Sequence, residues 1–152
     1  MMYKEIGGID TLRIADFKAW AKIDNGDNDI VELCLKQAAL RIQEYTNIAL
    51  LPCTISQTAS RDIIRLMQPI NEVISVKDGR GNECAFTFSP GQFLTIDTGV
   101  FSKGVIVEYS TEPLSSQVER MLIPVWELAL AIYDGNIELQ NKIILNLPLE
   151  LC

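Results

Sequence analysis

Hydrophobic residues between positions 30 and 46 recur with the period of an α-helix. At 100° per residue, five of them share one side, which we expect to face a core. These residues are Val31, Leu35, Ala38, Ile42 and Tyr45. Asn47 tolerates the left-handed backbone of a helix C-cap, so the helix is expected to end there. A shorter helical pattern covers residues 9–22.

The acidic stretch DNGDND, residues 24–29, precedes this long helix. A calcium loop of the EF-hand type that starts at Asn25 would place Ile30 where glycine is required and Lys36 where glutamate is required. This spacing argues against calcium binding. Asp29, followed three residues later by Glu32, instead predicts a capping box at the start of the helix.

A second long helical pattern covers residues 116–133. Its apolar side consists of Val118, Leu122, Val125, Ala129 and Ile132. Ser116 and Glu119 predict another capping box. Pro124 lies inside the pattern, where it removes one backbone hydrogen bond and predicts a kink. The sequence Asp-Gly-Asn at 134–136 is a stop signal for the helix.

Between the two long helices, short runs of β-branched and aromatic residues alternate with turns that contain glycine. The runs are CTISQTA, DIIRLM, VISV, CAFTF, FLTI and VIVEY, and Lys77-Asp78-Gly79 is expected to form a hairpin tip. This order predicts an α+β fold with two N-terminal helices, a small antiparallel β-meander and a C-terminal helix, around a mainly helical core.

Each long helix also carries a second apolar line away from its core side. Leu33 and Leu40 are seven residues apart on the first helix, and Ile123 and Leu130 have the same spacing on the second. Trp126 lies between the two apolar lines of the second helix. One interpretation is that both helices are covered on two sides within one subunit. The other is that these five residues form subunit interfaces, because an apolar line on a polar surface marks a contact site.

The last segment, IELQNKIILNLPLELC, is mostly apolar. We therefore divide the chain into a domain of residues 1–136 and an apolar C-terminal tail of residues 137–152. The tail either packs on its own subunit or becomes ordered against a partner. Its candidate contact residues are Ile143, Ile144, Leu145, Leu147, Leu149 and Leu151.

The composition fits a single globular domain, since 48% of the 152 residues are hydrophobic. The longest apolar run, MLIPVWELALAIY, is too short to span a bilayer. The opening MMYKEIGGID has no apolar region of the signal-peptide type. Four cysteines without a CxxC pair indicate reduced thiols in a cytoplasmic protein.

The charge and the residue types exclude several classes of function. The net charge is −7, and the 13 basic residues are scattered, so tight binding to nucleic acid is not expected. The sequence contains no histidine, which excludes His-based triads and histidine metal sites. Phosphate-binding glycine motifs are absent as well. We expect no catalytic residue, no cofactor and no metal, although a pair of carboxylates that meet in space would leave a hydrolytic enzyme open.

Several segments together resemble the head–tail connector, or adaptor, proteins of tailed bacteriophages. FKAWAKIDNGDNDIVELCLKQAALRIQEYTNIAL resembles the opening helices of that family, and VIVEYS and VERMLIPVWELALAIYDGN resemble its last strand and closing helix. IIRLMQPINEVISVKDGRGN resembles its central strand pair, with matches at Leu66, Pro69, Val73, Val76, Asp78 and Gly79. The resemblance runs from about Leu12 to Gly135. Asn47 stands where glycine is usual, and EYSTEPL replaces a Tyr-x-x-Gly sequence.

This resemblance implies a structural virion protein of the neck, assembled in the bacterial host cytoplasm. Such proteins form a ring of roughly a dozen copies beneath the portal protein. The ring extends the DNA channel and docks a downstream neck or tail-completion protein. DNA would pass through without specific binding, because carboxylates that line a channel repel phosphates. The tail would contact the portal, and no membrane is involved.

The alternative function is a non-enzymatic, monomeric or dimeric protein-binding module of phage or prophage origin. The two functions differ in assembly: a ring adaptor forms large homo-oligomers or joins a portal, whereas the module does not.

Overall fold

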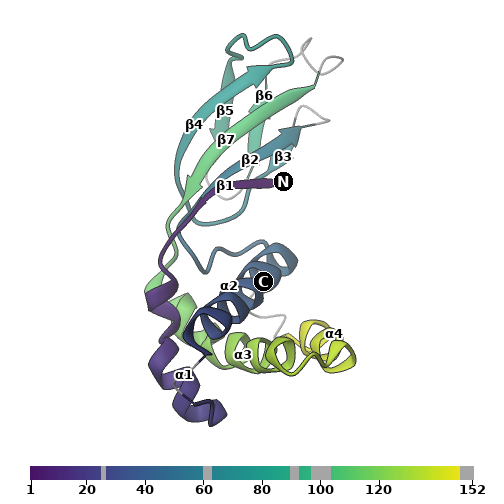
Figure 1. Cartoon of the computed structure of the whole chain (residues 1–152). Coiled ribbons are helices and arrows are strands. Elements are labelled where there is room, and N and C mark those ends of the chain that lie inside the picture. The colour runs from purple at the N-terminus through teal and green to yellow at the C-terminus, as the bar shows by residue number, and fades with distance from the viewer. Residues whose placement is uncertain (25–26, 60–62, 90–92, 97–103, 148–152) are drawn as a thin grey trace. The chain divides into compact units, whose positions relative to one another are not determined.

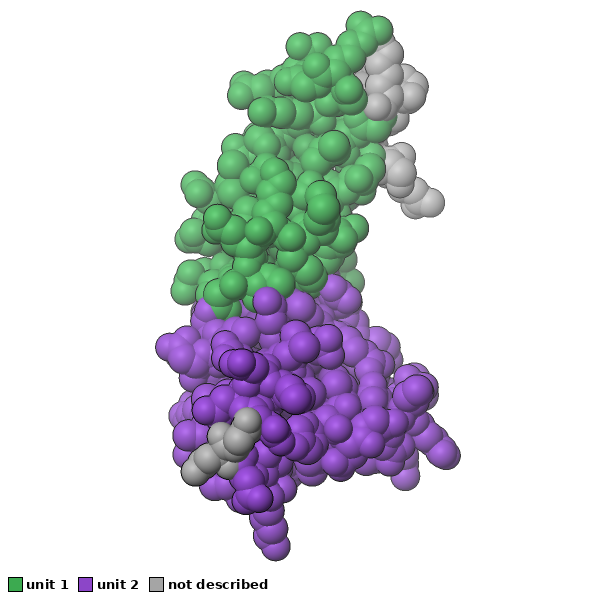
Figure 2. Space-filling model, in the orientation of Figure 1, with its two compact units in different colours: residues 1–7, 52–112 green, residues 8–51, 113–152 purple. Residues whose placement is uncertain are grey.

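Figure 1 shows the computed structural model of the chain, which describes residues 1–24, 27–59, 63–89, 93–96 and 104–147. The chain divides into two compact units, coloured separately in Figure 2. The β unit consists of residues 1–7 and 52–112, and the helical unit consists of residues 8–51 and 113–152. The predicted α+β fold class is confirmed.

The β unit contains two antiparallel sheets (Figure 1). Its strands are β1 (Met2–Ile6), β2 (Cys53–Ala59), β3 (Ile63–Arg65), β4 (Ile70–Asp78), β5 (Phe86–Ser89), β6 (Phe93–Ile96) and β7 (Val105–Thr111). One sheet has the order β1-β2-β7-β4 and the other has the order β3-β6-β5. Every strand predicted between the long helices is present. Strand β1 was not predicted, and the strand order is not the sequential one of a simple meander.

Strand β7 shows why these residues form a half-buried sheet. Its side chains alternate between a buried face and an exposed or partly exposed face, as the period of two requires. Val105, Val107, Tyr109 and Thr111 lie on the buried face. Thr111 Oγ1 accepts a hydrogen bond from the backbone N–H of Cys53 at 3.0 Å, which joins the ends of β7 and β2.

Tyr109 is the largest side chain that is fully buried in this unit. Its hydroxyl donates to Gln57 Oε1 at 2.8 Å and accepts from the backbone N–H of Met67 at 3.0 Å. Burial raises the pKa of Tyr109 to about 12, although the bond from Met67 acts in the opposite direction. The neutral phenol is therefore strongly preferred in the folded protein.

Tyr109 should make the stability of the protein fall as the pH rises in the alkaline range. Its folded pKa is higher than the value near 10 of an unfolded tyrosine, so its contribution is complete below pH 10. That contribution, about 3 kcal/mol, is lost as the pH rises from 10 through 12. Urea unfolding at pH 9 and pH 11.5, followed by circular dichroism, should show this loss. Tyr109→Phe should flatten the dependence, and Tyr45→Phe, at an exposed position, should not. An unchanged slope in Tyr109→Phe would contradict the assignment.

The helical unit contains a 3-10 turn and four helices among its described residues (Figure 1). They are η1 (Ile9–Leu12), α1 (Ile14–Ala21), α2 (Asn28–Thr46), α3 (Ser115–Tyr133) and α4 (Ile137–Leu145). Helix α2 packs along α3, and α4 packs on α3. The predicted long helices match α2 and α3 within two residues at each end.

The predicted core sides of α2 and α3 are buried, with two exceptions. Tyr45 was expected in the core of α2, but 51% of it is exposed. Thr46, one residue later, is buried, so the last turn of α2 is covered on the side of Ile42 and Thr46 and not on the side of Tyr45. Ile132, near the end of α3, is only partly buried. Pro124 lies inside α3, as predicted.

Both predicted capping boxes are wrong. Helix α2 begins one residue before Asp29, after Asp27, whose carboxylate accepts a hydrogen bond from the Tyr133 hydroxyl at 2.8 Å. This bond raises the pKa of Tyr133. Helix α3 follows Leu114 without a side-chain cap, and Glu119 forms an ion pair with Arg13 instead. Glu119, which the local pattern assigned to a cap, and Asp27, two residues before the predicted cap Asp29, each pair with a residue distant in sequence.

The turn after α2 is held by polar side chains. Asn47 has a φ of 60°, which confirms the predicted left-handed C-cap. Thr46 Oγ1 donates to the carbonyl of Ile42 at 2.8 Å. Gln43 is fully buried, and its Oε1 accepts from the backbone N–H groups of Leu50 and Leu51 at 3.1 and 3.3 Å. One amide oxygen therefore accepts from two buried backbone donors of the turn.

Trp126 joins the N-terminal segment of the helical unit to α3. Its indole N–H donates to the carbonyl of Leu12 at 3.0 Å, and Leu12 itself is fully buried. The Trp126 ring also packs against Phe17 and Trp20, with centroid separations of 6.1 and 5.8 Å. These contacts fix η1 and α1 against α3.

Candidate functional site

Helix α2 exposes an apolar line flanked by charges on the side opposite its core. Leu33 is 52% exposed and Leu40, two turns later, is partly exposed. Asp29 lies one turn before Leu33, and Lys36 lies one turn after it. We call these four residues the α2 strip.

Helix α3 carries a similar line on the side opposite the buried Val118 and Val125. Ile123 is 48% exposed, and Leu130, seven residues later, is partly exposed. Arg120 lies one turn before Ile123 and Glu127 lies one turn after it, both exposed. We call these four residues the α3 strip.

Trp126, the fifth candidate interface residue, is placed differently. Only 9% of it is exposed, and its ring and indole N–H are used by contacts within the helical unit. Trp20, which packs on Trp126, is 43% exposed. The aromatic side chain that reaches the surface beside α3 is therefore Trp20. The sequence pattern missed this residue, although a tryptophan at the end of a short helix was visible in it.

Helix α4 follows α3 but contributes no buried side chain. Two hydrogen bonds hold it: Gln140 Nε2 donates to the carbonyl of Ala131 at 3.3 Å, and Gln140 Oε1 accepts from Arg41 Nη1 at 2.9 Å. A shallow groove of about 280 Å³ lies between the two helices. Its lining includes Pro124, Glu127, Leu139, Lys142, Ile143, Asn146 and Leu147. The predicted tail is thus helical over residues 137–145.

The candidate portal-contact residues fall in several environments. Leu145 is 73% exposed, Ile143 and Ile144 are partly exposed, and Leu147 is buried. Leu149 and Leu151 lie outside the described residues. Ile137 and Leu139, which the prediction did not include, are 70% and 42% exposed. Helix α4 therefore presents apolar side chains to solvent at both ends.

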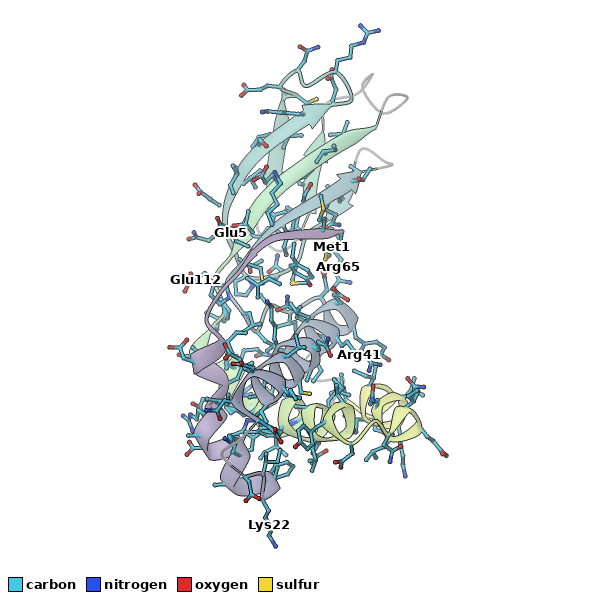
Figure 3. The ribbon with its side chains drawn as sticks, in the orientation of Figure 1. Met1, Glu5, Lys22, Arg41, Arg65 and Glu112 are labelled. Carbon is cyan, nitrogen blue, oxygen red and sulfur yellow. The ribbon has the colours of Figure 1, made fainter. Side chains whose placement is uncertain are left out.

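The β unit has an open depression of about 520 Å³ lined mainly by polar residues. Glu5 and Glu112, labelled in Figure 3, are two of the lining residues. Within the described part of the chain, no group of three or more potential metal ligands is close enough to hold a metal ion. Cys34, Cys53 and Cys84 are free thiols. This depression therefore lacks the ligand set of a metal site.

At the predicted hairpin tip, Asp78 has a structural role. Its Oδ1 accepts from the backbone N–H groups of Asn82 and Arg80 at 3.0 and 2.9 Å, and these bonds lower the pKa of the carboxyl. The hairpin turn is confirmed at this position.

In the described residues, no helix has the length and apolar character that crossing a bilayer requires.

No protein-family model matches the sequence, and no curated protein matches it. Solved structures do show the same fold. A chain in the neck of an empty gene transfer agent (GTA) particle computed with C6 symmetry superposes with a TM-score of 0.60 at 16% identity, covering 88% of this chain and 84% of that one.

Two further structures give the same result. A chain in the virion of a native GTA particle has a TM-score of 0.56 at 18% identity, with coverages of 88% and 84%. A chain in the neck of a native GTA particle computed with C12 symmetry has a TM-score of 0.51 at 17% identity, with coverages of 90% and 85%. At these identities the likeness establishes a shared fold. It agrees with the resemblance to head–tail connector proteins found in the sequence.

Proposed function

We propose that this chain is a structural protein of the neck of a phage or phage-like particle. The observation that carries this proposal is the shared fold, over 88% of the chain, with a chain in the neck of a GTA particle. A purely structural role also suits a molecule whose described polar residues form turns, caps and ion pairs rather than a catalytic arrangement.

In the more specific form of this proposal, the chain is a head–tail adaptor that forms a ring beneath the portal. The necks of the structural neighbours were computed with C6 and C12 symmetry, which fits a ring of roughly a dozen copies. The exposed leucine and isoleucine side chains of the α2 and α3 strips supply the contact surfaces that such a ring needs. The net charge of −7 suits a channel through which DNA slides without adhering.

The ring itself is the first test. We expect the purified chain to form a closed ring, alone or with the portal protein of its particle, and the ring to sit coaxially on the portal. Light scattering gives the mass, and negative-stain electron microscopy gives the symmetry and the stacking. A chain that stays monomeric or dimeric both alone and with the portal would instead support the protein-binding module.

The tail supplies the second test, because we place the portal contact on α4 and the residues after it. Leu145→Asp should prevent binding to the portal and leave the ring intact, since 73% of Leu145 is exposed and the charge costs the fold little. Asn141→Asp adds the same charge to an exposed position of α4 and should bind normally. Co-sedimentation with portal rings measures both variants. Equal binding by Leu145→Asp and the control would remove the tail from the portal interface.

A further inference from the structure

The α2 and α3 strips lie on opposite sides of the helix pair. Helix α2 packs on α3 through its buried side, which includes Val31, Leu35 and Ala38. Leu33 lies roughly 140–160° around α2 from those residues at 100° per residue. By the same rule, Ile123 lies roughly 140° or more from Val118 and Val125 on α3. The two exposed lines therefore point away from each other, so they cannot meet within one chain.

The two strips also match in apolar spacing. On α2, Leu33 and Leu40 are seven residues apart, and on α3, Ile123 and Leu130 are seven residues apart. Two helices that pack at a shallow angle bring residues at such intervals into register along a common seam. With the helices parallel, Leu33 meets Ile123 and Leu40 meets Leu130.

The charges beside the first apolar pair are complementary in this parallel register. The acid Asp29 precedes Leu33, whereas the base Arg120 precedes Ile123. The base Lys36 follows Leu33, whereas the acid Glu127 follows Ile123. In the antiparallel register that keeps both apolar pairs, Leu33 meets Leu130 and Leu40 meets Ile123. Lys36 would again lie near Glu127, but Asp29 would lie near Asp134, which is a pair of like charge. Like charges at a contact select against the wrong arrangement.

No ion pair within the described residues occupies the charged members of either strip, since the pairs found there are Lys4–Glu108 and Arg13–Glu119. Trp20 adds an exposed aromatic ring beside α3, and aromatic side chains are enriched at the centres of protein interfaces. Exposed apolar residues flanked by charges of opposite sign on the two strips fit a second copy of this chain.

We propose that α2 of one copy packs parallel to α3 of the next copy in the ring, so that Leu33 meets Ile123 and Leu40 meets Leu130. This inference rests on the ring described under the proposed function. Each copy then uses two different surfaces, which gives a head-to-tail contact that closes into a ring. Asp29 faces Arg120 and Lys36 faces Glu127 across each contact.

Directed disulfide formation tests the pairing. In a background with Cys84 and Cys152 replaced by serine, the double variant Leu33→Cys/Ile123→Cys should give a ladder of covalent oligomers on oxidation. The matched variant Leu33→Cys/Leu130→Cys, which fits the antiparallel register, should not. When chains carrying only Leu33→Cys are mixed with chains carrying only Ile123→Cys, oxidation should give covalent dimers of the two variants and no longer species. A ladder only in the antiparallel variant would overturn the proposal.

Charge reversal gives an independent measurement. Arg120→Glu should weaken self-association about tenfold, because it places two acids together. Adding Asp29→Arg in the same chain should restore most of the affinity. In the antiparallel arrangement Arg120 would not face Asp29, so Arg120→Glu would leave association nearly unchanged, and the size of the change decides between the two. Sedimentation velocity across a range of concentrations measures it.

The outcomes separate this pairing from the proposed function. If the wild-type chain forms rings but Leu33→Cys/Ile123→Cys does not cross-link, this interface is wrong and the ring adaptor stands. If the wild-type chain does not self-associate, alone or on a portal, and no variant cross-links, both proposals are overturned.

Discussion

Replacing Trp126 with alanine is expected to lower the free energy of unfolding by about 3–5 kcal/mol, the range seen for large aromatic residues removed from a core. The substitution removes the contacts of the Trp126 ring with Phe17 and Trp20. It also leaves the buried carbonyl of Leu12 without the indole N–H that donates to it. Urea unfolding monitored by circular dichroism measures the change. The N-terminal segment should become susceptible to proteolysis at lower urea than in the wild type.

Two variants separate the parts of this effect. Trp126→Phe keeps a ring but removes the indole N–H, so it should cost about 1–3 kcal/mol. Trp20→Ala removes a tryptophan that is 43% exposed, and its loss of stability should be clearly smaller than that of Trp126→Ala. Equal losses for the two alanine variants would show that Trp126 does not anchor η1 and α1 to α3.

Replacing Gln43 with alanine is expected to destabilise the protein by about 2–5 kcal/mol. Its amide oxygen accepts from two backbone N–H groups, of Leu50 and Leu51, and each buried donor left without a partner costs about 1–3 kcal/mol. The loss should appear in denaturant unfolding, with increased hydrogen exchange at the amides of these two leucines.

Gln37→Ala is the matched control for Gln43→Ala. It removes the same side chain from the same helix, but at an exposed position, so it should change stability by less than about 0.5 kcal/mol. Similar behaviour of the two variants would mean that the turn after α2 does not depend on the Gln43 amide.

The sequence predicted the elements whose signals are local. The 3.6-residue period located α2 and α3, and the left-handed tolerance of asparagine located the end of α2 at Asn47. Strand β2 was predicted with its observed ends, because the run CTISQTA is bounded by Pro52 and by a change in residue type. These features depend on residues within one or two turns of one another, so a single sequence contains the information.

The features that the sequence did not predict depend on distant partners. Strand β1 has five residues and is defined by its pairing with β2, some fifty residues later. The carboxylate of Asp27 pairs with Tyr133, and that of Glu119 pairs with Arg13, where local spacing had suggested caps. Helix α4 was missed because its apolar residues lie on more than one side and none is buried.

The candidate interface residues were found from their spacing, but their exposure required the structure. Leu33 and Ile123 are each about half exposed, whereas Trp126, which shares a helix with Ile123, is used internally. A helical wheel places Trp126 between the two apolar lines and cannot tell which neighbour covers it. The contacts with Leu12 and Phe17 come from a segment more than a hundred residues earlier in the chain.

The hydrogen bond between the Cys53 backbone and the Thr111 side chain has a consequence for exchanging segments between related proteins. The chain enters and leaves residues 52–112 through neighbouring strands, since Thr54 pairs with Ser110 and Cys53 N–H donates to Thr111 Oγ1. A block whose two ends are adjacent can be swapped between relatives without rerouting the remaining chain. Because β1 pairs with β2, a transplanted block must carry residues 1–7 with it. Chimaeras that exchange both segments together should fold, whereas those that exchange only residues 52–112 should lose the first strand of the sheet.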